Sequence, residues 1–258
     1  MRRRSSATDL GGRTAFVILE YCGGARTEAL HERLSEWNPR TPILVLDNAS
    51  PVNQASCVTH RNAVNSYVGG GIRDCLALAE TLGAQYLFYC VNDVEHVDPL
   101  LISDFEGLMN ADPDVVMVSC SLTPVSHQSV RFPWMVRQEG GGVRRVRVAD
   151  PICCLLRLDF IRSFGGFPIS RGGWGYSSEM AFHAKEQNKK IYVNDACTVR
   201  HVNAQTHLVA PDGKRIHKGY EADEVYRRRY GADPLRGALN DPNFDEFTPV
   251  ALLQPSPA

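Results

Sequence analysis

The sequence lacks a long hydrophobic run, an excess of one charge and the cysteine spacing of a zinc finger. No apolar stretch approaches the roughly 18 residues that a membrane-spanning helix needs. The 28 basic and 29 acidic residues leave a net charge of −1, so no general basic field is present to hold nucleic acid. None of the 8 cysteines forms a C-x-x-C pair, which excludes the usual spacing of structural zinc sites.

The N-terminus also lacks the apolar segment of a secretory signal. Three arginines stand directly after Met1, but Asp9, Gly11 and Gly12 interrupt the position where an apolar run would have to lie. We therefore expect residues 1–12 to form a disordered polar arm. Several cysteines lie inside apolar runs, which predicts buried thiols in a reducing compartment. Together these features favour a cytoplasmic protein.

Short apolar runs alternate with stretches of helical periodicity through the first 120 residues. At 258 residues and 43% hydrophobic composition, the chain can bury a large core. The alternation predicts a mostly parallel sheet with right-handed crossovers. The expected strands are 14–19, 42–46, 86–91 and 115–119, with a weak one at 57–60, and the expected helices are 27–37, 72–82 and 99–110.

The second half is less regular. Its prolines and glycines over 121–142 indicate a long loop. Arg144, Arg145 and Arg147 indicate a solvated strand face or, alternatively, a contact with an anionic acceptor such as a lipid phosphate or nucleic acid. We expect one domain over 13–234, with a nucleotide-binding half at 13–120, an acceptor-binding half at 121–234 and a Pro-rich tail at 235–258. The other elements expected are strands at 143–148, 152–156, 190–193 and 198–201, and helices at 158–164, 177–188 and 220–230.

Polar residues follow three of the predicted strands. Glu20-Tyr21, Asp47-Asn48 and Asn92-Asp93 each stand where a strand ends. In open α/β sheets, ligands bind beyond the carboxyl ends of the strands. These clusters therefore predict a ligand site along one rim of the sheet.

In this order, the segments resemble the inverting family 2 glycosyltransferases. No motif is specific alone, but the ordered set spans about residues 14–230. The resemblance implies an α/β fold of GT-A type: a single Rossmann-like mixed sheet flanked by helices, with an acceptor-side subregion. The segments that carry it are Phe16–Tyr21, Ile43–Ser50, the glycines 69–71 with Arg73, Tyr86–Glu95, Gly165–Phe167, Glu179-Met180 and Thr198–His201.

Two motifs depart from the family pattern. The metal-binding D-x-D triplet maps to Val91-Asn92-Asp93, so its first acid is missing. The family's acidic motif around the base maps to Tyr176–Met180. Its leading acidic pair is absent there, and Glu179 is the acid that remains.

The resemblance implies a role for each candidate residue. Asp93 and His201 would bind a divalent cation, Mn²⁺ or Mg²⁺, which oxygen-rich sites favour. Glu179 would be the catalytic base, with Glu95 as the competing carboxylate. Glu20, Tyr21, Asp47, Asn48, Gly70, Arg73 and Asn92 would bind the nucleotide, and Trp134, Trp174 and Tyr176 would line the acceptor pocket.

The function implied is inverting transfer of a hexose-type sugar from a nucleoside-diphosphate sugar, with UDP expected, to an acceptor hydroxyl. Glycan, lipid carrier, small molecule, protein and modified nucleobase remain open as acceptors. A sugar-phosphate nucleotidyltransferase is one alternative, although Glu20–Gly24 lacks the basic phosphate loop expected there. A non-catalytic nucleotide-sugar binding protein is the other.

Overall fold

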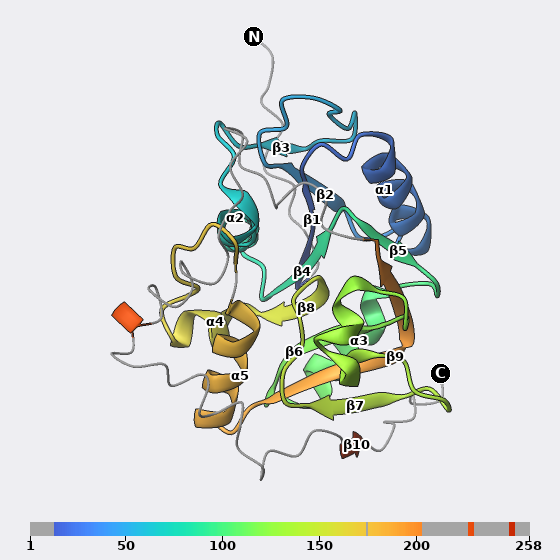
Figure 1. The fold of residues 1–258 in the computed structure, drawn as a ribbon, viewed down its shortest axis with the longest axis vertical. Helices are drawn as coiled ribbons and strands as arrows, with labels where there is room; N and C mark the ends of the chain where they lie inside the picture. Colours follow the sequence, from blue (N-terminus) through green and yellow to red (C-terminus); the bar gives the residue numbers. More distant parts are fainter. Residues whose placement is uncertain (1–12, 174, 203–226, 230–247, 251–258) are drawn as a thin grey trace.

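A single ten-stranded mixed sheet organises the computed structural model, which describes residues 13–173, 175–202, 227–229 and 248–250 (Figure 1). The strand order is β10-β7-β9-β6-β8-β4-β1-β2-β3, and β5 pairs with β9. The helices cover the faces of this sheet. Of the helices within the described ranges, none is both long and apolar enough to cross a membrane.

The first four strands form a parallel block. They are β1 (Thr14–Glu20), β2 (Ile43–Asp47), β3 (His60–Arg61) and β4 (Tyr86–Val91). Helix α1 (Ala25–Trp37) joins β1 to β2, and α2 (Tyr67–Thr81) leads to β4 on the other side of β1. The strand order therefore reverses direction at β1, and such reversals open a crevice at the strand ends.

The second half of the chain completes the same sheet. Its strands are β5 (Val94–His96), β6 (Val115–Leu122), β7 (Val143–Val146), β8 (Cys153–Arg157), β9 (Lys190–His201) and β10 (Thr248–Val250). Strand β8 is antiparallel to both of its neighbours, β4 and β6, and lies between them. The remaining helices are α3 (Ile102–Ala111), α4 (Leu158–Ser163), α5 (Tyr176–Glu186) and the short 3-10 helices η1 (His127–Val130) and η2 (Pro133–Met135).

Most predicted elements are present, and three expectations are wrong. Helix α2 begins at Tyr67, so the glycine triplet lies inside it instead of before it. Strands 190–193 and 198–201 are one continuous strand, β9. Arg144 is 5% exposed and pairs with the carboxylate of Asp195, with Nε 2.7 Å from Oδ2, so it does not belong to a solvated face. The predicted helix at 220–230 lies largely outside the described residues.

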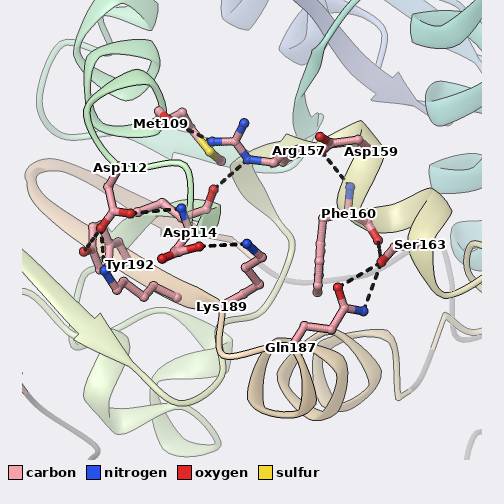
Figure 2. A network of polar contacts seen from close by, with 12 residues as sticks. Met109, Asp112, Asp114, Arg157, Asp159, Phe160, Ser163, Gln187, Lys189 and Tyr192 are labelled. Carbon is pink, nitrogen blue, oxygen red and sulfur yellow. Dashed lines mark hydrogen bonds and ion pairs between the residues drawn. The ribbon is translucent and has the colours of Figure 1, made fainter.

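A polar network ties together the start of β9, the end of α3 and the end of β8 (Figure 2). Lys189 Nζ lies 2.7 Å from Asp114 Oδ1, and Lys190 Nζ lies 2.7 Å from Asp112 Oδ2. The guanidinium of Arg157 donates to the carbonyl of Met109 at 2.8 Å. These contacts fix the end of the sheet from which β6 and β9 start, whereas the polar strand-end clusters stand at the ends of β1, β2 and β4.

Candidate functional site

A cavity of about 220 Å³ opens where β1 and β4 end, at the reversal of strand order. Strand ends, the start of α2, η1 and the segment before β8 all contribute to its wall. Its polar lining residues are Tyr21, Asn48, Asn65, Tyr67, Tyr89, Asn92, Asp93, Gln128, Arg131, Asp150, Tyr176, Ser177, Ser178 and His201.

Asp93 and His201 meet at the wall of this cavity. Asp93 precedes β5 and His201 ends β9, and the pairing of Val94 with His201 brings them together across 108 residues. Asp93 Oδ1 lies 3.0 Å from His201 Nε2. Burial opposes ionisation of Asp93, but the hydrogen bond and charge of His201, aided by the charge of Arg26, lower its pKa below the usual value. The carboxylate is therefore ionised at neutral pH.

The other ring nitrogen of His201 is also engaged. Nδ1 contacts Gln128 Oε1, an amide oxygen that accepts a hydrogen bond. In this structure His201 Nε2 and Asp93 Oδ1 hydrogen-bond to each other, and a cation held by both would take the place of the Nε2 proton. Two candidate ligand atoms that face each other in this way suit a shared cation. Cis ligands at about 2.1 Å from an octahedral ion lie about 3.0 Å apart, which matches the separation here.

Glu20 does not line the cavity. It is fully buried, and its carboxylate accepts hydrogen bonds from the amides of Gly23 and Gly24, the hydroxyl of Thr27 and Nδ2 of Asn92. The side chain thus shapes the turn from β1 into α1 and fixes Asn92. Tyr21 and Asn92 are part of the wall.

Asp47 likewise acts within the protein. Its Oδ1 accepts hydrogen bonds from the amide and hydroxyl of Ser50, and its Oδ2 lies 3.0 Å from Arg61 Nη1.

Asn48, the next residue, does line the cavity. Its Nδ2 donates to the carbonyl of Tyr67, and its Oδ1 accepts hydrogen bonds from Ser66 and Asn62, so it fixes the start of α2.

The glycine triplet of α2 serves packing, and neither Gly70 nor Arg73 lines the cavity. A Cβ on Gly69 would lie 1.8 Å from the carbonyl oxygen of Ser170, and one on Gly71 would lie 2.6 Å from Leu19 Cδ2. A Cβ on Gly70 would collide with the side chain of Ser66. The triplet therefore brings the start of α2 against β1 and against the segment before α5.

Neither carboxylate predicted as the base reaches the cavity. Glu179 lies in the first turn of α5, is fully buried, and pairs with Arg229, with Oε1 3.2 Å from Nε. Glu95 is exposed on β5, where its Oε2 lies 3.5 Å from Arg200 Nη1. Their positions make Glu179 an internal ion-pair partner and Glu95 a surface residue in this structure.

Asp150 is a carboxylate that the sequence did not single out. It lines the cavity just before β8, and Ser177 Oγ donates to its Oδ1 at 3.2 Å. An Asp before a proline reads as a turn, so no local pattern distinguished it. The sequence did not single out Gln128 or Tyr67 either, because each lies outside the expected helices and strands.

The three aromatic residues predicted to line the acceptor pocket have different outcomes. Tyr176 lines the cavity, stacks on Phe167 with ring centroids 4.4 Å apart, and donates its hydroxyl proton to the carbonyl of Pro168. Trp134 is not in the wall. Its Nε1 donates to Val148 and its ring meets Phe132, which does line the cavity. Trp174 lies outside the described residues.

Comparison with known proteins identifies the fold. No protein-family model and no curated protein matches the chain. Among solved structures, GalNAc-T7 with UDP, GalNAc and Mn²⁺ aligns with a TM-score of 0.56 at 13% identity, over 75% of this chain and 44% of GalNAc-T7. The chain thus spans less than half of that protein. A197 from STIV aligns over 80% of this chain and 93% of its own length at 13% identity, with a TM-score of 0.46, and no argument rests on it.

GalNAc-T7 is a GT-A glycosyltransferase, so the expected fold class is confirmed: a mixed α/β sheet flanked by helices, of GT-A type. At 13% identity the likeness shows the fold alone.

Proposed function

We propose that this protein of GT-A fold is a metal-assisted glycosyltransferase that moves a hexose-type sugar from a UDP-linked donor to an acceptor hydroxyl with inversion. The observation that carries the proposal is the pair formed by Asp93 and His201, 3.0 Å apart at the wall of a cavity at the strand ends. A relative in fold, GalNAc-T7, was crystallised with UDP and Mn²⁺.

Asp93 and His201 are the proposed ligands of Mn²⁺ or Mg²⁺. One carboxylate oxygen and one imidazole nitrogen suit Mn²⁺, with phosphate oxygens and water as further ligands. A cation bound there would offset the negative charge that develops on a leaving diphosphate. The nucleoside end of the donor would contact Tyr21, Asn48 and Asn92, which already line the cavity.

Asp150 is the proposed base, in place of Glu179. A base must reach the proton it removes, and Asp150 faces the cavity whereas Glu179 is buried against Arg229. The hydroxyl of Ser177 orients the Asp150 carboxylate. In an inverting displacement, this carboxylate accepts the acceptor's hydroxyl proton as the acceptor oxygen bonds to the anomeric carbon, while the bond from that carbon to the diphosphate breaks and the nucleoside diphosphate leaves with the electron pair.

The test is release of nucleoside diphosphate from a panel of UDP-, GDP- and TDP-sugars with Mn²⁺, with and without acceptors. Asp93→Ala and His201→Ala should each lower release on the order of 100-fold, as removal of a charge-stabilising group does. Asp114→Ala is the matched control, because it removes an acid at the other end of the sheet (Figure 2). Asp150→Asn should lower transfer by about 10²–10⁴-fold.

Other outcomes would replace parts of the proposal. Tight donor binding with no turnover on any acceptor indicates a binding protein. Pyrophosphate formed from a nucleoside triphosphate and a sugar phosphate indicates a nucleotidyltransferase. A product with the donor's own anomeric configuration, measured by proton NMR coupling, would rule out inversion and remove the need for Asp150 as a base.

A further inference from the structure

Four cysteines stand in a row across neighbouring strands in the protein core. Cys90 on β4 is paired in register with Cys153 on β8. The sulfur of Cys120 on β6 lies 3.5 Å from that of Cys153 and 3.4 Å from that of Cys197 on β9. All four are at most 3% exposed, and none forms a disulfide.

His96 completes this group. Its ligand nitrogen and the sulfurs of Cys90 and Cys153 all lie within 4.8 Å of one another. His96 is 8% exposed, and within the described residues neither of its ring nitrogens has a hydrogen-bond partner. A buried polar group left unpaired costs about 1–3 kcal/mol, so an unpaired imidazole beside thiols needs an explanation.

We infer that Cys90, His96 and Cys153 bind a thiophilic cation of the Zn²⁺ class as its three protein ligands. The chemistry selects this class, since sulfur and imidazole are ligands of Zn²⁺, whereas Mg²⁺ and Mn²⁺ prefer oxygen. The site is therefore distinct in kind from the pair at Asp93 and His201. It goes beyond the proposed function and does not depend on it.

The dimensions and the charges fit. Ligand atoms of tetrahedral zinc lie about 3.8 Å apart, and the three atoms here lie within 4.8 Å of one another, so they need to approach by at most about 1 Å, within the range of side-chain rotation. Binding releases a proton from each of Cys90 and Cys153 to solvent, while neutral His96 supplies a lone pair. Two thiolates then balance the dication, which leaves no net charge in the apolar core.

Such an ion would join three strands. Cys90 is on β4, Cys153 on β8 and His96 at the end of β5, three residues after Asp93. Because the site is buried, the ion would enter during folding. It would then hold β5 against the centre of the sheet and so support the position of Asp93 from inside the molecule.

The experiment is metal analysis of the full chain carrying Asp93→Ala and His201→Ala, which removes the other candidate site. This protein is purified from zinc-supplemented cells, dialysed against a chelator and analysed for zinc. A second sample is refolded with one equivalent of Co²⁺. We expect about one zinc per chain and a near-ultraviolet thiolate-to-cobalt charge-transfer band.

Two kinds of variant decide the result. Cys153→Ala and His96→Leu should lose the zinc and the cobalt band. Cys154→Ala should keep both, because Cys154 is equally buried on the same strand but alternates to the opposite face of the sheet. Circular dichroism confirms folding of each variant. A folded parent chain without zinc or a cobalt band, or Cys153→Ala retaining both, would overturn the inference. Turnover of the nucleotide-sugar donor is measured separately, on the chain that keeps Asp93 and His201. Failure of the proposed function can therefore be told apart from failure of the zinc inference.

Discussion

At the scale of single residues, the close contacts of the glycines in α2 decide how the cavity is shaped. Gly69 touches the segment before α5 so closely that no Cβ fits. The sequence predicted that the triplet lies near the donor, but a run of glycines does not say which neighbour it approaches. The neighbour of Gly69 is Ser170, which lies about a hundred residues further along the chain.

Gly69→Ala is therefore expected to destabilise the protein by about 1–3 kcal/mol, the usual cost of overpacking. The same substitution at Gly107 is the matched control. Gly107 is also helical but has open space around its Cβ position, so Ala there should stabilise by about 0.5–1 kcal/mol. Urea unfolding of both variants measures the difference. Equal effects would mean that the contact with Ser170 is not tight.

In the candidate site too, local sequence predicts some features, and others depend on contacts between residues far apart in the chain. The resemblance implied that Asp93 and His201 bind one metal ion, and the structure brings the two side chains within 3.0 Å. Glu20 and Asp47 follow strands, yet their carboxylates bind their own turns. A strand-end position gives the rim of the sheet but not the direction of the side chain. Asp150 stands two residues after the predicted strand at 143–148, and nothing in the sequence shows that it faces the cavity.

At the scale of elements, α5 and the end of α4 are joined by a histidine stacked on a phenylalanine. The His183 and Phe164 rings are parallel within 2°, with centroids 4.4 Å apart. Burial, together with the charge of Arg229, lowers the pKa of His183 from its usual 6.5 to about 4. The neutral ring is thus the form that packs.

This pKa shift predicts an acid sensitivity. The folded pKa lies below the unfolded one, so between pH 6.5 and pH 4 the unfolded chain binds a proton that the folded chain does not. Stability from this residue is complete above pH 6.5 and falls as the pH drops toward 4. Between about pH 7 and about pH 5 we expect wild type to lose about 1 kcal/mol more than His183→Gln, an amount reduced for partial exposure. Urea titrations at both pH values measure this, and parallel losses would contradict it.

Local pattern predicted most elements well, because their periodicity is strong. Strand β4 matches its predicted bounds, and β1 and α3 differ by a few residues. The burial of Arg144 was not predictable in this way. Its partner Asp195 is fifty-one residues distant in sequence and becomes its neighbour when β7 pairs with β9.

At the scale of the whole molecule, the two halves expected from the sequence share one sheet. Strand β8 belongs to the second half, but it lies between β4 and β6 of the first half. Composition and periodicity gave no sign of this order, because strand pairing depends on contacts far apart in the chain. The core is accordingly one continuous cluster.

We therefore expect the protein to unfold in one step. Far-ultraviolet circular dichroism and tryptophan fluorescence should give the same urea midpoint, as in two-state unfolding. A fragment of residues 13–120 should show no cooperative transition, because β4 and β6 would lack the strand that separates them. Two distinct midpoints, or a folded fragment, would show that the halves are independent.

The position of β8 also bears on synthesis. A ribosome must release residues as far as Arg157 before β4 and β6 acquire their shared neighbour. Until then the nascent chain presents one open edge of β4 and the unpaired strand β6, both largely apolar, the kind of surface that aggregates or recruits chaperones. Translation speed through the segment between β6 and β8 should thus govern the yield of native protein in cells.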